Sequence, residues 1–277
     1  MSVPVLDLPT GRPIPQLGLG TARTDDATAR RVVAQALELG YRLVDTAAKY
    51  ENEVGVGQGI ADAGLPREDL YVTTKLRGAD QGYAPTRTAL RASLERLGLD
   101  HVDLYLVHWP LPRLGLFAES YRAMVEMREE GLTRAVGVSN FLPEHLDVLH
   151  AEGLPVPAVN QVEFHPRLQQ RGVLDDNTRR GVVTQAWSPL GAGKGLLEEE
   201  PVRAAAQRHG VSPAQVVLRW DVQHGVVTIP KASSRERLAQ NLDVFSFSLD
   251  DAEVAAIDAL ERGERVGGQD PALHEEF

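Results

Sequence analysis

Four side chains with complementary acid–base properties follow short apolar runs of the sequence. They are Asp45 in the run 43–46, Tyr50 shortly after it, Lys75 at the end of 70–75, and His108 at the end of 102–108. A phenol can give up a proton, an ammonium beside it lowers the phenol pKa, and an imidazole can hydrogen-bond a carbonyl oxygen. The set contains no nucleophile and no metal cage. It suits protonation of an oxygen on which charge develops, as in carbonyl reduction by hydride from a nicotinamide.

Each of these residues also has an ordinary structural explanation when it is taken alone. Asp45 and Lys75 could form only a buried ion pair between strands. Tyr50 could be a plain loop tyrosine, and His108 a satisfied core histidine. The chemical interpretation is favoured because all four fall at the carboxyl ends of three consecutive apolar runs.

A second polar cluster follows the run 226–229 and enters a helical stretch. It comprises Lys231, Ser233, Ser234, Arg235 and Arg237, with Asn241 beyond. Two hydroxyls, the first backbone amides of a helix and up to three cations converge there, in a chain with a net charge of −10. The alternative is a solvated helix start with arginine–glutamate pairs. A bound phosphate is favoured, because cations at a helix N-terminus oppose the helix dipole unless an anion is present.

The elements that must position these residues alternate regularly along the chain. Eight apolar runs, typical of buried parallel strands, occupy 17–21, 43–46, 70–75, 102–108, 135–138, 158–163, 182–186 and 226–229. Helical patterns occupy 25–39, 52–63, 85–97, 116–130, 143–150, 172–180, 201–209, 212–224, 236–242 and 250–260. Eight strand–helix units predict an α/β fold, a (β/α)8 TIM barrel with its active site at the carboxyl ends of the strands.

Two further features concern the ends of this barrel. Segments 5–8 and 13–16, around Thr10-Gly11, predict an N-terminal β-hairpin that covers the bottom of the barrel. An open doubly wound sheet is the alternative fold, but the stretch Gly18-Leu-Gly20-Thr-Ala-Arg23 lacks the third glycine of its phosphate-binding turn.

Composition limits the classes of function. The 277 residues are 43% apolar and 25% charged and contain no cysteine, so disulfides, thiolate catalysis and iron–sulfur clusters are excluded. The acidic balance disfavours nucleic-acid binding. We expect no signal peptide, and the sequence contains no apolar run of about 18 residues and no histidine spacing of the HExxH kind. We expect a single domain over 1–277, cytoplasmic and monomeric, without a metal, that acts on a small molecule.

The chain resembles the aldo-keto reductases over almost its full length. The matching motifs are Gly40-Tyr-Arg-Leu-Val-Asp45-Thr-Ala-Ala-Lys-Tyr50 with Asn52-Glu53, Thr73-Thr-Lys75, Asp103-Leu-Tyr-Leu-Val-His108-Trp-Pro, Gly137-Val-Ser-Asn140-Phe, Asn160-Gln161-Val-Glu-Phe-His165-Pro and Ile229-Pro-Lys231 with Arg237 and Asn241. Together they are highly specific. The resemblance implies a (β/α)8 barrel and NADPH-dependent reduction of aldehydes or ketones.

The resemblance also implies roles for individual residues. Asp45, Tyr50, Lys75 and His108 would form a catalytic tetrad with Tyr50 as proton donor, and Tyr50, His108 and Trp109 would contact the substrate. The cofactor would be bound by Thr21, Asp45, Ser139, Asn140, Gln161, Trp187, Ser188, Leu190, Gly191, Lys231, Ser233, Ser234, Arg237 and Asn241. Among these, Ser139, Asn140 and Gln161 would hold the carboxamide, and Trp187 would stack on the nicotinamide unless it only packs in the core. Lys231, Ser233 and Arg237 would bind the 2′-phosphate, with Asn241 near the adenine.

The chain looks most like the bacterial branch that includes 2,5-diketo-D-gluconate reductases. The stretch Gln185-Ala-Trp187-Ser-Pro-Leu-Gly and the short segment after His108 are its marks. Ala22 stands where many animal members have tryptophan, and the short tail from Gly263 is expected to remove another specificity element. These departures leave the substrate open among 2,5-diketo-D-gluconate, related keto sugars and other small carbonyl compounds.

Two other functions are compatible with these residues. A cofactor-binding sensor or accessory barrel with little turnover would keep the same fold. A phosphate-binding barrel aldolase would use Lys75 as a Schiff-base lysine. Borohydride trapping on Lys75 would identify the aldolase, and tight cofactor binding without turnover would identify the sensor.

Overall fold

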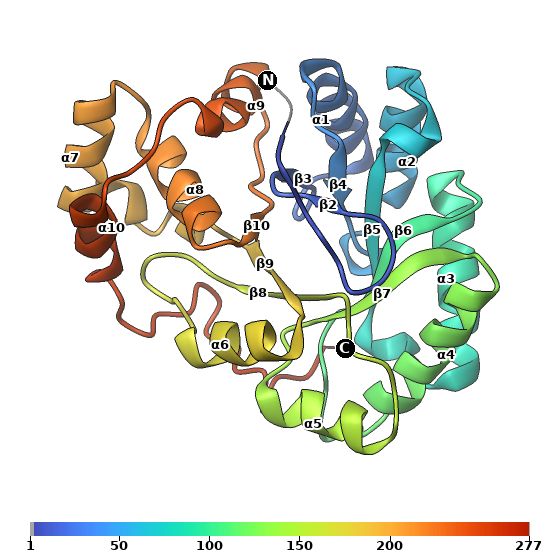
Figure 1. Ribbon diagram of the computed structural model, residues 1–277. Helices are drawn as coiled ribbons and strands as arrows, with labels where there is room; N and C mark the ends of the chain where they lie inside the picture. Colours follow the sequence, from blue (N-terminus) through green and yellow to red (C-terminus); the bar gives the residue numbers. More distant parts are fainter. Residues whose placement is uncertain (1–2, 277) are drawn as a thin grey trace.

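Eight parallel strands form the inner wall of the protein, as Figure 1 shows for the computed structural model, which describes residues 3–276. They are β3 (Gly18–Gly20), β4 (Leu43–Asp45), β5 (Tyr71–Leu76), β6 (Val102–Val107), β7 (Thr133–Ser139), β8 (Val159–Glu163), β9 (Val183–Trp187) and β10 (Val227–Thr228). The strands pair in chain order, and a parallel bridge between Leu17 and Thr228 joins the last strand to the first. The predicted (β/α)8 barrel is confirmed.

The strands are apolar along their whole length because both of their faces are covered. All six residues of β6 are buried, and so are all six of β5. The parallel register then brings strand ends to a common level: Gly20 pairs with Asp45, Ser139 with Gln161, and Glu163 with Trp187. The polar residues predicted to carry chemistry therefore meet at one end of the barrel.

Helices surround the strands in a ring, which is clear in Figure 1. The α-helices are α1 (Asp26–Leu39), α2 (Glu53–Ala63), α3 (Tyr83–Leu97), α4 (Phe117–Glu129), α5 (Pro143–Ala151), α6 (Arg171–Arg180), α7 (Glu200–His209), α8 (Pro213–Gln223), α9 (Arg235–Leu242) and α10 (Asp251–Asp258). Helix α3 begins at Tyr83 rather than at Pro85. The proline still fits, because backbone N–H groups in the first turn of a helix have no intrahelical acceptor.

In the part of the chain that the structure describes, six short 3-10 turns were not predicted from the sequence. They are η1 (Ala48–Tyr50), η2 (Arg67–Asp69), η3 (Gly78–Asp80), η4 (Gly191–Gly193), η5 (Leu196–Glu198) and η6 (Asp243–Phe245). Single turns of this kind have too little hydrophobic periodicity to be read from a sequence. Three of them, η1, η3 and η4, lie in loops at the carboxyl ends of strands.

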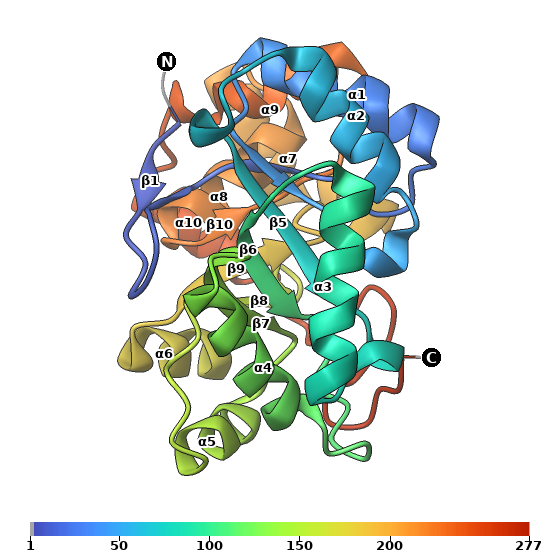
Figure 2. The same ribbon diagram turned by 90° about the vertical axis from the view of Figure 1, so that its right-hand side faces the viewer.

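The predicted N-terminal hairpin is present as strands β1 (Val5–Leu6) and β2 (Ile14–Pro15). Arg12, in its turn, donates to the carbonyl oxygens of Glu68 and Leu70 and lies 3.3 Å from the buried carboxylate of Asp103. Figure 2 shows this hairpin and the C-terminal tail on opposite sides of the barrel. The hairpin therefore covers the end away from the polar cluster. No helix within residues 3–276 is long and apolar enough to cross a membrane.

Candidate active site

Lys75 is the centre of the polar cluster at the carboxyl ends of the strands. Its side chain is fully buried, and its Nζ donates to Asp45 Oδ1 at 2.5 Å, to the carbonyl oxygen of Thr46 at 2.9 Å, and to the Tyr50 hydroxyl at 3.3 Å. An ammonium group has three hydrogens, so this environment uses all of them. The geometry holds the Tyr50 oxygen beside a positive charge.

Burial and charge shift the pKa values of this group in opposite directions. Burial by itself would lower the pKa of the Lys75 ammonium, but the Asp45 carboxylate and the Tyr50 hydroxyl raise it above its ordinary value. Burial raises the pKa of the Tyr50 hydroxyl, Lys75 lowers it part of the way, and Asp45 raises it again. The net pKa of Tyr50 is above its ordinary value, so the phenol keeps its proton at neutral pH.

This result corrects one prediction made from the sequence. The ammonium of Lys75 does act to lower the pKa of Tyr50, but desolvation of the phenol is the larger effect. The expectation of a net lowering was wrong because it considered the charge and not the burial. A phenol with a raised pKa remains a proton donor, which is the role that the resemblance implies for Tyr50.

His108 completes the cluster from the end of β6. Its ring lies edge-on to the Tyr50 ring, with 5.8 Å between the centroids. Trp109 follows it and is buried, and Gln81 Nε2 donates to the Trp109 carbonyl oxygen at 2.7 Å. All four predicted tetrad side chains are thus brought together by three neighbouring strand ends and the η1 turn.

A row of hydrogen-bonded side chains crosses the barrel beneath the cluster. Gln161 Nε2 donates to Asp45 Oδ2 at 2.7 Å and to Gln185 Oε1 at 2.9 Å. Asp45 therefore has Lys75 on one oxygen and Gln161 on the other. The Thr21 hydroxyl donates to the Asp45 carbonyl oxygen at 3.0 Å. No role was predicted for Gln185, because its place on β9 beside Gln161 on β8 depends on the strand register.

Asn140 and Ser139 lie next to this row at the end of β7. Asn140 adopts a left-handed backbone conformation with φ of +62°, and its Nδ2 donates to the His108 carbonyl oxygen at 3.0 Å and to Ser139 Oγ at 3.1 Å. Trp187 Nε1 donates to Asn140 Oδ1 at 2.8 Å, which orients the indole at the end of β9. Trp187 is only partly buried, so one part of its surface faces outward. The Asn140 side chain therefore links the end of β6, where His108 lies, to the end of β9, where Trp187 lies.

Asn52 anchors the chain that follows the η1 turn to the ends of β3 and β4. It is fully buried; its Nδ2 donates to the Thr21 carbonyl oxygen at 2.8 Å, and its Oδ1 accepts from the Thr46 hydroxyl at 2.9 Å. The neighbouring Glu53 accepts from the Thr74 hydroxyl at 2.6 Å and pairs with Arg96 at 2.6 Å. The motif containing Asn52 and Glu53 was noticed in the sequence, but the hydrogen bonds by which these residues anchor the chain shortly after Tyr50 appear only in the structure.

The loop after β9 contains the predicted residues Ser188, Leu190 and Gly191. Ser188 has a φ of +51° and Gly191 a φ of +64°, and the Gly191 N–H donates to the Ser188 carbonyl oxygen at 2.9 Å. A Cβ atom at Gly191 would lie 3.1 Å from Leu196. Glycine is therefore suited to this position both by its backbone conformation and by the space available.

The predicted anion site lies at the start of α9. Ser234 caps the helix by accepting from the Arg237 N–H at 3.4 Å, and Lys231, Ser233 and Arg237 are exposed. Arg235 pairs with Glu38 at 2.7 Å. Within residues 3–276 neither Lys231 nor Arg237 has an ion-pair partner. Asn241, by contrast, is buried on α9.

The C-terminal tail corrects a second prediction. A short tail from Gly263 was expected to leave this side of the site without an element from the chain end. Instead, His274 packs on Trp109 with 4.2 Å between ring centroids, and Glu276 Oε1 lies 2.9 Å from His108 Nδ1. The tail is short but runs directly to the site, which its length alone does not reveal.

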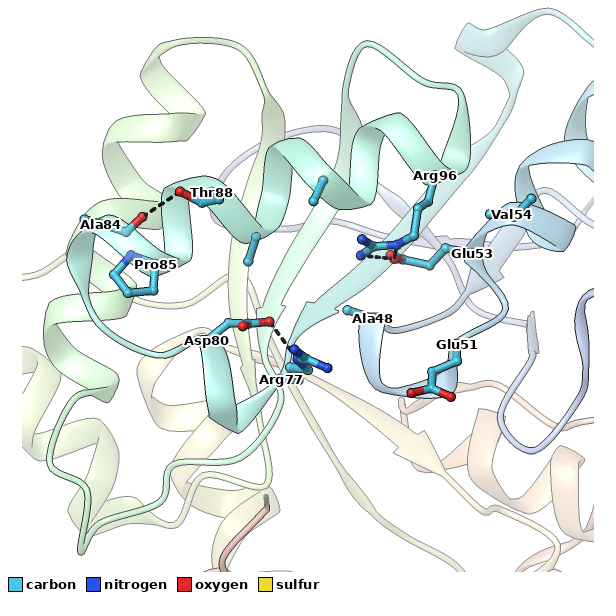
Figure 3. A pocket seen from close by; sticks show the side chains of 12 residues that line it. Ala48, Glu51, Glu53, Val54, Arg77, Asp80, Ala84, Pro85, Thr88 and Arg96 are labelled. Atoms are coloured by element: carbon cyan, nitrogen blue, oxygen red, sulfur yellow. Dashed lines mark hydrogen bonds and ion pairs between the residues drawn. The ribbon is translucent and has the colours of Figure 1, made fainter.

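A separate pocket of about 690 Å³ lies beside α2 and α3 (Figure 3). Its polar lining includes Arg77, paired with Asp80 at 2.8 Å, and Arg96, paired with Glu53. Tyr50, Lys75 and His108 do not line it; it shares with the site only residues of the η1 turn and its flank. Since its two arginines are already neutralised, the chemistry is better sought at the tetrad. Within residues 3–276 no three His, Cys, Asp or Glu side chains are grouped to hold a metal ion.

Comparison with known proteins identifies the family of the chain. The sequence profile described as the Aldo/keto reductase family matches residues 15–262. The chain belongs to the aldo/keto reductase family. A relative from Mycolicibacterium smegmatis (strain ATCC 700084 / mc(2)155), named an aldo-keto reductase, is 47% identical to this reductase over 264 residues, which are 95% of this chain and 96% of the relative.

Solved structures extend the agreement to three dimensions. The crystal structure of Gox0644 in its apo form superimposes on the reductase with a TM-score of 0.94, at 40% identity, covering 99% of this chain and all of the other. A Bombyx mori aldo-keto reductase in complex with NADP gives a TM-score of 0.90 at 34% identity, with 96% and 95% of the two chains covered. A mutant of Gox0644 was solved with NADPH. The predicted class, an NADP-dependent oxidoreductase, is confirmed through the family.

Proposed function

We propose that this reductase transfers hydride from NADPH to the carbonyl carbon of small aldehydes or ketones, with Tyr50 as the proton donor. The observation that carries the proposal is the buried Lys75 ammonium, held between Asp45 at 2.5 Å and the Tyr50 hydroxyl at 3.3 Å. An ammonium in this position stabilises the phenolate that remains after the proton has left. A phenol beside an ammonium can therefore donate a proton to a substrate oxygen that gains negative charge during the reaction.

The residues present fit NADPH at both of its ends. At the start of α9, Lys231 and Arg237 are exposed cations without ion-pair partners among residues 3–276, next to the hydroxyls of Ser233 and Ser234. Such a donor set fits a phosphate, and it lies in a chain with a net charge of −10. At the barrel end, both amide hydrogens of Gln161 are donated inside the protein, which leaves its Oε1 to accept from a carboxamide N–H.

The remaining predicted contacts follow from this placement. We infer that Ser139 and Asn140 complete the carboxamide site with Gln161, and that Trp187 covers the nicotinamide ring. Thr21, Asp45, Ser188, Leu190, Gly191 and Asn241 complete the set proposed for the cofactor. The support for these assignments is that the loops carrying these residues follow strands or begin α9 at the same end of the barrel.

The reaction assigns a distinct task to each residue of the tetrad. NADPH supplies the hydride when it is bound. Tyr50 holds a proton on its oxygen at neutral pH and releases it to the oxygen of the substrate as charge develops there. Lys75 balances the phenolate, Asp45 keeps Lys75 charged, and His108 orients the carbonyl group together with Trp109.

Lys75 bears on the first alternative function, the aldolase, and the complete tetrad bears on the second, the sensor. A Schiff-base aldolase needs a neutral amine, whereas Lys75 has a raised pKa and donates three hydrogen bonds. The structure therefore disfavours the aldolase. A sensor would need only the cofactor site. It would not require the complete tetrad that serves proton donation.

Among substrates, we propose small keto sugars and related carbonyl compounds, 2,5-diketo-D-gluconate among them. The support is the resemblance of the Gln185–Gly191 stretch to the bacterial branch. Ala22 is a small residue where many animal members of the family have tryptophan. A panel of sugar-derived and apolar aldehydes and ketones, assayed with NADPH and with NADH, tests this assignment.

The change Tyr50→Phe tests the function itself. Removal of the proton donor should lower kcat by about 10²- to 10⁴-fold, because a positioned general acid contributes a factor of that size. The Kd of NADPH, measured by fluorescence titration, should stay within about twofold of the wild-type value, since the phenol is not proposed to bind the cofactor tightly.

Tyr83→Phe is the matched control, because the Tyr83 hydroxyl contacts Glu126 far from the tetrad. It should leave kcat unchanged. Retention of full activity by the Tyr50 variant would remove Tyr50 from its proposed role. Tight NADPH binding by the wild-type protein, without turnover of any compound in the panel, would favour the sensor.

A further inference from the structure

The loop after β9, residues 188–199, has a strained backbone. Its left-handed positions include two that are not glycine, Ser188 with a φ of +51° and Ala192 with a φ of +46°. Its internal hydrogen bonds are those of single turns, such as the bond from the Lys194 N–H to the Gly191 carbonyl oxygen at 3.0 Å. Left-handed conformations at non-glycine residues are costly and persist only where the surroundings hold them. Contacts from outside the loop are therefore needed to stabilise this shape.

Arg167, in the loop after β8, supplies such contacts. Its Nη1 donates to the Lys194 carbonyl oxygen at 2.6 Å, and its Nη2 donates to the Gly195 carbonyl oxygen at 3.0 Å. Its Nε donates to Glu199 Oε1 at 2.9 Å. The planar guanidinium thus binds the loop after β9 at three points with donors in fixed directions. A lysine, with one nitrogen on a flexible stem, does not offer this geometry.

The ion pair between Arg167 and Glu199 is shielded from water. Only 14% of the Arg167 side chain and 16% of the Glu199 side chain are exposed, and Nη2 lies 2.5 Å from Oε1. Arg262 approaches the same oxygen at 2.9 Å. The Arg167 guanidinium, together with Arg262, outweighs burial and holds the pKa of Glu199 below its ordinary value. The carboxylate is therefore charged at neutral pH, and its hydrogen bonds with Arg167 are of the strong, charge-assisted kind.

The backbone of Arg167 is held in turn by the start of the C-terminal tail. Its carbonyl oxygen accepts from the N–H groups of Arg262 at 3.2 Å and of Glu264 at 3.1 Å. The Gln169 N–H, two residues further on, donates to Glu261 Oε2 at 2.5 Å. In Figure 1 the dark red tail leaves α10 toward α6, the helix that follows this loop. Arg167 therefore reaches the loop after β9 from an anchored position.

The loop after β9 lies between the two proposed ends of the cofactor site. In the sheet, β9 stands between β8, which carries Gln161, and β10, which leads to the anion site at the start of α9. The diphosphate is the middle part of NADPH. At Leu190 and Gly191 the backbone changes from a φ of −91° to a φ of +64°. This alternation turns neighbouring N–H groups toward one side, which favours an anion there.

We propose that Arg167 is a positioning residue that holds the loop after β9 in the shape that receives the cofactor diphosphate. It acts through the backbone at Lys194 and Gly195 and through Glu199, without touching the cofactor itself. The assignment of the diphosphate to this loop rests on the proposed function, whereas the attachment of the loop by Arg167 does not. Since the diphosphate is common to NADPH and NADH, the effect of Arg167 is the same for both cofactors.

Arg167→Lys tests this role, because it keeps the positive charge and removes the guanidinium geometry. The Kd of NADPH and the Kd of NADH, measured by fluorescence titration, should both rise fivefold or more and by the same factor. The probe 2′-AMP carries the 2′-phosphate but no diphosphate. Its Kd, measured by isothermal titration calorimetry, should stay within twofold of the wild-type value, which a general loss of structure would not allow.

Arg171→Lys is the matched control, because it makes the same change at the start of α6. Arg171 lies 3.5 Å from Asp258 and donates to Gln169 Oε1 at 2.8 Å, and these partners are not in the loop after β9. The Kd values of NADPH, NADH and 2′-AMP should all stay within twofold of those of the wild type.

Hydrogen exchange followed by mass spectrometry tests the attachment in the ligand-free protein. Arg167→Lys should raise the exchange rates of amides in 188–199 at least fivefold and leave those of 102–107, in β6, unchanged. Unchanged exchange in 188–199, an unchanged Kd of NADPH, or an equal loss of affinity for NADPH and 2′-AMP would overturn the proposal. Absence of turnover by a wild-type protein that binds NADPH would instead overturn the proposed function and leave the binding and exchange results valid.

Discussion

Lys75 shows how a buried charge becomes useful in a protein interior. An ammonium without partners would lose its proton or destabilise the fold, because burial disfavours the charged form. Here one carboxylate, one carbonyl oxygen and one phenol accept its three hydrogens. The same contacts that keep Lys75 charged also hold Tyr50, so stability and chemistry depend on one side chain.

Lys231 and Arg237 are the residues at which the choice between NADPH and NADH is expected to be made. The double change Lys231→Gln, Arg237→Gln removes both unpaired cations and keeps two long polar side chains. We expect the KM for NADPH to rise at least tenfold and the KM for NADH to change less than twofold, since only NADPH carries the 2′-phosphate. Steady-state kinetics with both cofactors measure this difference.

Arg235→Gln is the control for the same helix start. Arg235 is also a cation of the first turn of α9, but it already pairs with Glu38 at 2.7 Å. Its removal should affect the two cofactors equally. An equal loss for NADPH and NADH in the double variant would mean that the phosphate lies elsewhere.

At the scale of elements, α2 is the helix that fixes how closely the outer ring can pack beside the active site. Three of its residues, Gly55, Gly57 and Gly59, face backbone atoms of neighbouring helices at distances that leave no room for a Cβ. The helix begins directly after Asn52 and the η1 turn. The close packing of α2 therefore holds the segment that carries Tyr50.

Gly57→Ala should lower stability, although alanine favours helix formation. A Cβ at this position would lie 2.2 Å from the carbonyl oxygen of Leu97, so the helices would have to move apart. We expect a loss of about 1–3 kcal/mol, the usual size for overpacking of a core. Thermal unfolding followed by circular dichroism measures the change.

Gly172→Ala is the matched comparison, because Gly172 is also within a helix, α6, and has no atom within 4 Å of a built Cβ. This variant should gain about 0.4–1 kcal/mol from the reduced entropy of the unfolded chain. A shift of the same sign in both variants would show that close helix approach is not what selects glycine in α2.

At the scale of the whole molecule, stability depends on pH through a carboxyl group far from the active site. Asp221 lies in α8 and is fully buried; its Oδ2 accepts from the Thr228 hydroxyl at 2.7 Å, and within residues 3–276 its Oδ1 has no partner. Burial raises the pKa of Asp221 well above its ordinary value of 3.8, and the Thr228 contact lowers it only in part. The folded protein therefore retains a proton that the unfolded chain has released.

The sign of the effect follows from proton binding. Between pH 3.8 and the raised pKa the folded state binds more protons than the unfolded state, so the free energy of unfolding falls as pH rises. The slope from this one group reaches at most about 1.4 kcal/mol per pH unit. Asp221→Asn removes the proton exchange and should be more stable relative to wild type at pH 8 than at pH 5.

Urea unfolding at the two pH values measures this difference. Asp175→Asn, which removes an exposed carboxylate, should show no such change between pH 5 and pH 8. A constant difference between Asp221→Asn and wild type over this range would mean that Asp221 is ionised in the folded protein.

The amino-acid sequence by itself determined the barrel and the residue types of its site. Continuous apolar runs and amphipathic stretches depend on local periodicity, and eight repeats of the unit leave few other ways to bury both faces of the strands. The polar ends of these runs could be found because strand ends are marked by a change from apolar to polar residues. Asp45, Lys75 and His108 were located in this way.

Only the tertiary structure decided the contacts between residues distant in sequence. The η1 turn that presents Tyr50, the bond from Gln161 to Asp45, and the approach of Glu276 to His108 leave no local pattern. The direction of the Tyr50 pKa shift likewise required the burial of its hydroxyl to be known. Desolvation and long-range hydrogen bonds depend on the packed surroundings of a group, and a linear sequence does not specify which distant residues supply them.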